Sequence, residues 1–168
     1  MIDIENIRIG DLLQVNKDGL CIKKGTLVEI RGVHADDTLP AKGLTGSLSC
    51  RPLDDTQFDG EIWAAYLDPI PITEDFLKKN GFALDNGFGE MKDYPRYVWC
   101  DKNADANPAI VSVRVYRMPI GDVRFLTKCE SHSRHEDGLN NFHSCDVENI
   151  HQLQHLAKEC GIKLHVKP

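Results

Sequence analysis

The chain lacks any long apolar run. Its longest local stretch, IWAAYL at Ile62–Leu67, is far shorter than the about 20 apolar residues of a membrane-spanning helix. The first ten residues, MIDIENIRIG, carry acidic side chains where an export signal carries basic ones, and no apolar segment follows them. We therefore expect a cytoplasmic protein without a membrane partner.

The chain also lacks the common sequence signatures of catalysis. No G-x-x-x-x-G-K-[ST], G-x-G-x-x-G or G-x-S-x-G occurs, so phosphate loops, dinucleotide folds and nucleophile elbows find no support. Pairs of acidic residues fall in predicted turns or at the start of a predicted helix. We expect no catalytic residue and no cofactor, and interpret the protein as a non-enzyme.

No C-x-x-C occurs among the six cysteines, which excludes a thioredoxin-like dithiol and a zinc knuckle. A chain of 168 residues without an export signal does not need disulfides for stability. We expect all six thiols to be reduced and most of them to be buried as small hydrophobic side chains. They are Cys21, Cys50, Cys100, Cys129, Cys145 and Cys160.

Positive charge is scarce in the first part of the chain. The formal net charge is −6, and residues 1–71 contribute 7 Lys and Arg against 12 Asp and Glu, a balance of −5. Residues 72–168 contribute 13 against 14, a balance of −1. Because an acidic surface repels phosphate, nucleic acid is not expected to bind the first part.

The first part, residues 1–69, is predicted to be a small SH3-like β-barrel. Four segments rich in β-branched and apolar residues alternate with turn residues such as NKDG and KG, and no helix is expected among them. The predicted strands are Ile7–Val15, Thr26–Val33, Leu44–Arg51 and Glu61–Leu67. The DPIP sequence at Asp68–Pro71 fixes an extended backbone that is not expected inside a strand ladder, and it marks the domain boundary.

Residues 70–168 are predicted to form a helix, an antiparallel meander of strands and a second helix, an α+β unit with both helices on one face of the sheet. The first helix, about residues 74–80, is expected to be capped by Thr73 and stopped by Gly81, with Phe82 folding back on its last turn. The second, about residues 147–160, is expected to be capped by Asp146 and stopped by Gly161. Between them, across about residues 82–145, strands are predicted at Tyr97–Asp101, Ala109–Arg117, Asp122–Cys129 and Asn141–Cys145.

Three motifs in this layout resemble a family of small uncharacterised proteins from gut bacteria and their phages and mobile elements. That family opens with R-I-G-[DN], continues with I-P-[IL]-T-E-x-[FIL]-L-x-K-x-G-F and closes with V-H-[EQ]-L-Q-[HN]-L. The corresponding stretches read IRIGD at Ile7–Asp11, IPITEDFLKKNGF at Ile70–Phe82 and IHQLQHL at Ile150–Leu156. The resemblance implies the two-part layout, and it implies no activity, cofactor or site residue.

The closing motif contains HQLQH, one letter from the zinc-peptidase signature H-E-x-x-H. Gln152 stands where the glutamate base would be, and an amide cannot take a proton from metal-bound water. At about 100° per residue, His151, His155 and Glu159 fall opposite the apolar stripe of the helix. We expect solvent-facing histidines there, and a metal site formed by these three residues, with histidines of the loop 130–141 nearby, is a weak alternative.

Arginines and an aromatic residue accompany the predicted strands of the second part: Arg96, Arg114, Tyr116 and Arg124. If the helices cover one face of the sheet, Arg114 and Tyr116 share the other face. Arginine and tyrosine on an open sheet pair with phosphates and stack on bases, but both residue types are also common on exposed strands.

Three hypotheses about function follow. The first is a non-enzymatic accessory or protein-interaction module, whose partner is another protein that the sequence does not identify. The alternative is a nucleic-acid-binding protein that uses the Arg/Tyr sheet face, which the acidic net charge disfavours. The second alternative is metal binding through the C-terminal histidines.

Overall fold

A computed structural model divides the chain into two compact units, residues 1–70 and 71–167. It describes residues 4–19, 21–35, 46–54, 59–85, 95–100, 109–117, 123–131, 141–159, 162, 164, 166 and 167. For residues 35, 109, 116, 117, 126–131 and 141–144 it describes the backbone alone. Among these residues, no helix has the length and apolar character needed to cross a membrane.

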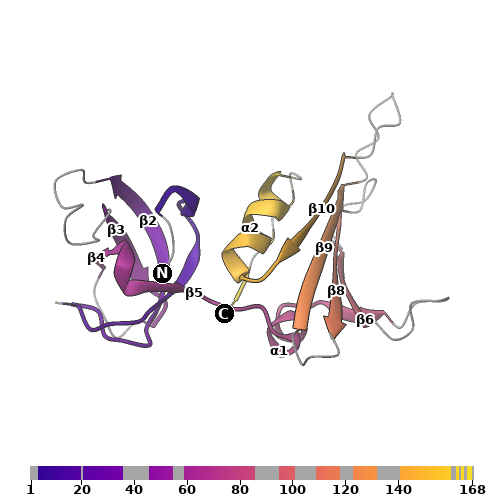
Figure 1. Ribbon diagram of the computed structural model, residues 1–168, viewed down its shortest axis with the longest axis horizontal. Helices are drawn as coiled ribbons and strands as arrows, with labels where there is room; N and C mark the ends of the chain where they lie inside the picture. Colours follow the sequence, from indigo (N-terminus) through magenta and orange to yellow (C-terminus); the bar gives the residue numbers. More distant parts are fainter. Residues whose placement is uncertain are drawn as a thin grey trace. The chain divides into compact units, whose positions relative to one another are not determined.

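The first unit is a five-stranded antiparallel sheet with the strand order β4-β3-β2-β1-β5 (Figure 1). Its elements are η1 (Ile4–Asn6), β1 (Leu12–Val15), β2 (Leu27–Ala35), β3 (Gly46–Pro52), β4 (Gly60–Trp63), η3 (Ala64–Tyr66) and β5 (Leu67–Pro69). One side of the sheet buries an apolar core that includes Leu13, Val28, Leu48 and Leu67, each 0% exposed. No strand pairing between described residues closes the sheet into a barrel.

The IRIGD motif forms a turn and not the start of the predicted first strand. Asp11 N donates to Arg8 O at 3.1 Å, and Gly10 between them has φ +95°, as the third position of a type II turn requires. The Asp11 side chain is buried, and its carboxylate accepts a hydrogen bond from Arg8 N at 2.8 Å, the second hydrogen bond between these two residues. Strand β1 therefore begins only at Leu12.

The predicted strand Glu61–Leu67 is interrupted by the short 3-10 helix η3, so the expectation of a first unit without helix is wrong. The chain then returns as β5 to pair with β1, which brings Pro69 opposite Leu13. Pro71 in turn forms an isolated bridge with Asn149. Pro69 thus takes part in strand pairing, contrary to the prediction, because an edge strand such as β5 tolerates a residue without an N–H.

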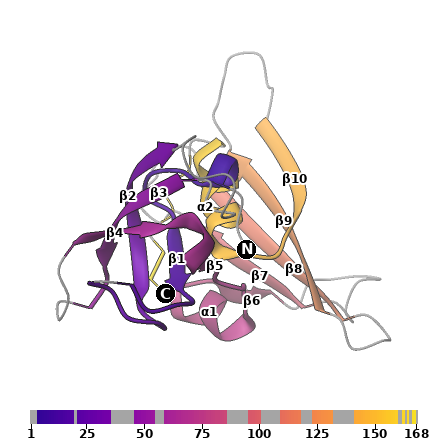
Figure 2. The same cartoon turned by 60° about the vertical axis from the view of Figure 1, so that its left-hand side comes forward.

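The second unit is the predicted antiparallel meander, with the strand order β10-β9-β8-β7-β6 (Figure 2). Its elements are α1 (Glu74–Lys79), β6 (Ala83–Asp85), β7 (Arg96–Cys100), β8 (Ala109–Arg117), β9 (Val123–Ser131), β10 (Asn141–Val147) and α2 (Ile150–Glu159). Both helices lie on the same side of this sheet in Figures 1 and 2. The α+β class predicted from the sequence is confirmed at this level.

Both ends of α1 are formed as the sequence predicts. Thr73 Oγ1 accepts a hydrogen bond from Phe76 N at 3.1 Å. Gly81 has φ +79°, and the amide of the buried Phe82 donates to Leu77 O at 3.0 Å. These bonds satisfy helix-end groups that would otherwise lack partners.

The start of α2 differs from the prediction. Val147 is the last residue of β10, and Asp146 lies within that strand and caps nothing. The first residues of the second unit pair with the chain between β10 and α2, where Ile72 N donates to Glu148 O at 2.9 Å. The helix therefore begins only at Ile150.

Candidate nucleic-acid interface

The two histidines of α2 do not lie where the helical wheel places them. His151 is only 5% exposed and His155 is half-buried, with their rings edge to face and their centroids 5.8 Å apart. The prediction that both face solvent is therefore wrong for His151, because a helical wheel places residues relative to the apolar stripe of one helix and does not include the neighbouring segments. Glu159 is exposed on the last turn.

These residues do not assemble into a metal site in the described part of the chain. No group of three or more His, Cys, Asp and Glu side chains there could hold a metal ion. The loop histidines His132 and His135 lie outside the described residues, and only the backbone of His143 is described.

Gln152 has a structural role at the start of α2. Its side-chain oxygen accepts hydrogen bonds from Glu148 N at 2.8 Å and from Asn149 N at 3.1 Å. A glutamine or glutamate at the third helical position that reaches back in this way is half of a capping box. The residue that breaks the zinc-peptidase signature is therefore the one that caps the helix.

The strand register brings the predicted nucleic-acid residues onto one face of the second sheet. A single cross-strand row runs through all five strands, with each residue paired to the next. It consists of Asp85, Arg96, Arg114, Leu126 and Asp146. Two residues after Arg114 on β8, Tyr116 pairs with Arg124 of β9, so this second pair belongs to the same face as the row. We call the face with Asp85, Arg96, Arg114, Tyr116 and Arg124 the arginine face.

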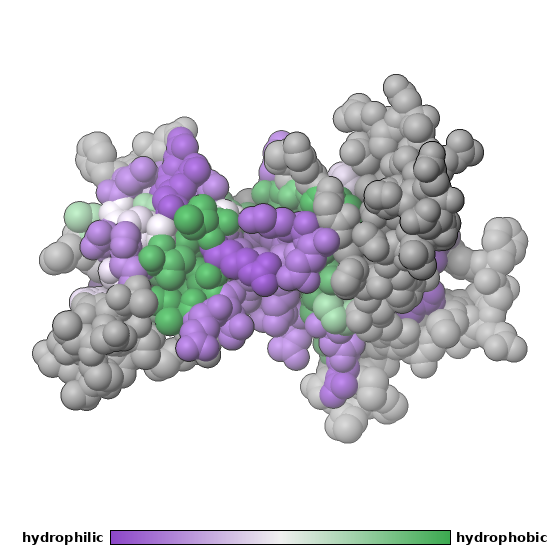
Figure 3. All heavy atoms as spheres, turned by 90° about the horizontal axis from the view of Figure 1, so that it is seen from above, coloured by the Kyte–Doolittle hydropathy of each residue, from purple (hydrophilic) through white to green (hydrophobic). Residues whose placement is uncertain are grey.

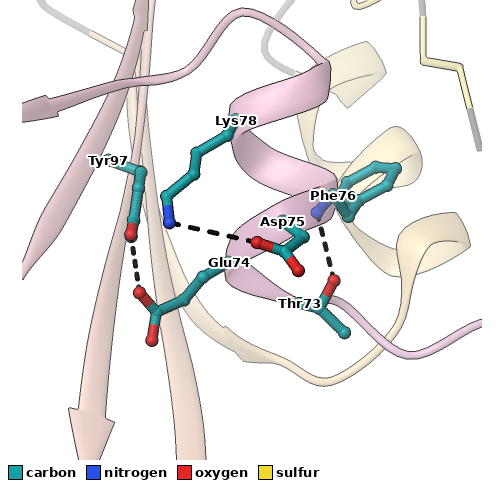
Figure 4. A network of polar contacts seen from close by, with 6 residues as sticks. All are labelled: Thr73, Glu74, Asp75, Phe76, Lys78 and Tyr97. Atoms are coloured by element: carbon teal, nitrogen blue, oxygen red, sulfur yellow. Dashed lines mark hydrogen bonds and ion pairs between the residues drawn. The ribbon is translucent and has the colours of Figure 1, made fainter.

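The opposite face of the sheet is used for packing. Val111, Val113 and Val115 of β8 are each 0% exposed. Tyr97, which pairs with Val113, is 2% exposed and donates its hydroxyl hydrogen to Glu74 Oε2 on α1 at 2.6 Å (Figure 4). Because side chains alternate between the faces of a strand, this packing directs Arg96 and Arg114 away from α1.

Salt bridging differs among the three arginines. Arg96 donates from Nη2 and Nε to one oxygen of Asp85, at 2.5 and 3.1 Å. Arg114 is half-buried on the central strand, and Arg124 is exposed. Neither of these two forms an ion pair or a side-chain hydrogen bond with any residue in the described ranges.

Arg96 and Arg114 form a pair of like charges directly opposite each other, an arrangement that destabilises a sheet by roughly 0.2–1 kcal/mol. Asp85 offsets this repulsion from the β6 side of the row. Asp146, at the other end of the row, lies two strands and therefore about 10 Å from Arg114. The row thus leaves a positive centre between two acidic ends.

Asp85 was not among the predicted site residues. The available signal was the Asn-Gly pair directly after it, which is typical of a hairpin and makes Asp85 the last residue of a strand. Its pairing with Arg96 depends on the starting residue of β7, and this strand begins one residue before the predicted Tyr97.

The expectation that most cysteines are buried is wrong for those whose side chains are described. Cys50 is buried, and burial raises the pKa of its thiol to about 12. Cys21, Cys100 and Cys145 are exposed free thiols. Partial desolvation raises the pKa of Cys145, and the nearby carboxylates of Asp146 and Glu159 raise it further.

No family model, curated protein or solved structure matches this chain. The resemblance to the gut-bacterial and phage family stays a prediction that rests on its three motifs.

Proposed function

We propose that the protein is a non-enzymatic binding module and that its second unit binds single-stranded nucleic acid on the arginine face. The observation that supports this most directly is the register. It makes Arg96 and Arg114 neighbours on adjacent strands and Tyr116 and Arg124 neighbours on the next pair of positions.

A sheet face of this composition suits an unpaired strand. Single strands bind where basic side chains hold the phosphates and aromatic rings stack on the bases, largely without regard to sequence. Arg114 suits the phosphate role because it is half-buried, and partial desolvation strengthens charge-assisted hydrogen bonds. Tyr116 is assigned the stacking role because of its register position beside Arg124.

The acidic balance of the chain limits the strength of this binding. The net charge of −6 lies mostly in the first part of the sequence, which repels a polyanion over a distance of about one Debye length. Binding is therefore expected at low ionic strength and is expected to weaken steeply as salt is added.

Fluorescence anisotropy with a labelled oligothymidylate tests the proposal. The double variant Arg114→Gln/Arg124→Gln should bind at least about tenfold more weakly, because it loses two charge-assisted contacts. The matched control, Lys158→Gln/Lys167→Gln, removes two exposed charges from the same unit away from the arginine face. Equal losses in both variants, or no binding by the wild type, would contradict the proposal.

A second candidate function, binding of another protein by the first unit, is favoured by the strand order of that unit. We propose that this unit is an SH3-like barrel: β5 returns to pair with β1, and contact between the two edge strands β4 and β5 would close the sheet. Ile9, at the tip of the IRIGD turn, is 63% exposed, and hydrophobic surface is visible on this unit in Figure 3.

Affinity capture with the full chain tests this second candidate. A protein partner bound through the turn should be retained by the wild type and lost with Ile9→Ser. Leu84→Ser is the matched control, since Leu84 is also an exposed large apolar side chain (49%) but belongs to the second unit. If the wild type, Ile9→Ser and Leu84→Ser all capture the same proteins, binding of a protein partner through the Ile9 turn is contradicted.

A further inference from the structure

Asp85 occupies one end of the charged row on the arginine face, and its carboxylate takes two hydrogen bonds from the Arg96 guanidinium. A guanidinium binds carboxylate and phosphate with the same planar array of donors. From this geometry we infer that Asp85 is a built-in competitor of phosphate, which neutralises Arg96 and restrains binding of nucleic acid. This inference rests on the proposed function.

The Arg96–Asp85 pair is accessible to an incoming phosphate. The side chains are 39% and 40% exposed, respectively, so that solvent screens the pair and the pair adds little to stability. Asp85 also belongs to β6, a strand of three residues at the edge of the sheet. A half-buried carboxylate on a short edge strand can therefore release its arginine to a phosphate without disturbing the core.

The row supplies its own control at the opposite end. Asp146 is exposed, lies in the same cross-strand row and belongs to the other edge strand, β10. Its position two strands from Arg114 and three from Arg96 prevents a direct ion pair with either residue. Removing the charge of Asp85 changes the net charge as much as removing that of Asp146. Only the loss of the Asp85 charge frees Arg96 from its ion pair.

The experiment measures oligothymidylate affinity by anisotropy for the wild type, Asp85→Asn, Asp85→Glu and Asp146→Asn. Asp85→Asn should bind about two- to fivefold more tightly than Asp146→Asn, which is the range expected for loss of a surface ion pair. The slope of log K against log salt should steepen by about 0.7, one additional phosphate contact on a single strand. Asp85→Glu, which keeps the charge, should bind as the wild type does.

Equal affinities for Asp85→Asn and Asp146→Asn would show a general charge effect and overturn the inference while leaving the proposed function intact. Weaker binding by Asp85→Asn than by the wild type would also overturn it, since Asp85 would then position Arg96 for the ligand. If no chain binds in a salt-dependent way, the proposed function itself fails.

Discussion

At the scale of single residues, Gln152 shows that the HQLQH motif caps a helix although it looks like a zinc-peptidase signature. Replacing Gln152 with alanine should lower the free energy of unfolding by about 1 kcal/mol, because two amides at the start of α2 lose their acceptor. Gln152→Glu keeps the acceptor and adds a negative charge near the positive end of the helix dipole, so it should be at least as stable as the wild type. Urea denaturation of both variants measures the difference.

Gln152→Glu also completes the H-E-x-x-H signature. Because His151 is buried, the restored motif should not take up zinc, and elemental analysis of untagged protein checks this. One zinc per chain in Gln152→Glu, lost again when His151→Ala is added, would contradict our assignment of the motif to helix capping.

The cysteines should differ in reactivity according to their surroundings. With iodoacetamide at pH 8, Cys50 should be alkylated only after unfolding, because it is buried and its pKa is about 12, whereas the thiolate is the reactive form. Cys145 should react slowly, since its raised pKa leaves less thiolate at a given pH.

Glu159→Gln should accelerate alkylation of Cys145 and move its pH profile to lower pH, because one of the charges that raise its pKa is removed. Mass spectrometry of the labelled peptides gives both rates. An unchanged profile for Cys145 in this variant would show that Glu159 does not act on the thiol.

At the scale of elements, α1 is attached to the sheet by one hydrogen bond to a charged group. Tyr97→Phe removes the donor to Glu74 while keeping the buried ring, and should cost roughly 1.5–3 kcal/mol of unfolding free energy. Lys78, which lies 6.0 Å over the same ring, keeps its contact in this variant. Thermal or urea denaturation measures the loss, and a double-mutant cycle with Glu74→Gln assigns it to the pair.

A coupling energy near zero in that cycle would show that Tyr97 and Glu74 act independently. In that case the docking of α1 would not depend on the hydrogen bond between Tyr97 and Glu74.

Local signals made some elements predictable. Thr73 and Gly81 determine the ends of α1 through bonds within a few residues, and the alternation of Val111, Val113 and Val115 identifies β8 as a half-buried strand. The start of α2 was not predictable in this way, because it depends on pairing of Ile72 with Glu148, which are 76 positions apart in the sequence.

The candidate site was predictable only in part for the same reason. Arg96, Arg114, Tyr116 and Arg124 were identified from their residue types and strand positions. Their arrangement in rows, the ion pair with Asp85 and the burial of His151 all depend on contacts between distant segments. A helical wheel or a strand pattern considers one segment at a time and therefore cannot predict contacts between distant segments.

At the scale of the whole molecule, the two parts of the chain differ in charge. The first part has a balance of −5 and the second a balance of −1, so an anionic ligand is repelled by one and tolerated by the other. Under the proposed function, this difference favours binding of nucleic acid by the second unit and leaves the first available for a protein partner. One chain could thereby bind two kinds of macromolecule through separate units.

The salt dependence of nucleic-acid binding by the wild type tests the central claim most directly. Arg114 and Arg124 are the two arginines of the face that form no described ion pair, and each phosphate contact with a single strand contributes about −0.7 to the slope. The plot of log K against log salt should therefore have a slope of about −1.4, and Arg114→Gln/Arg124→Gln should bring it close to zero. A wild-type slope near zero, or an unchanged slope in the double variant, would contradict the assignment of the arginine face.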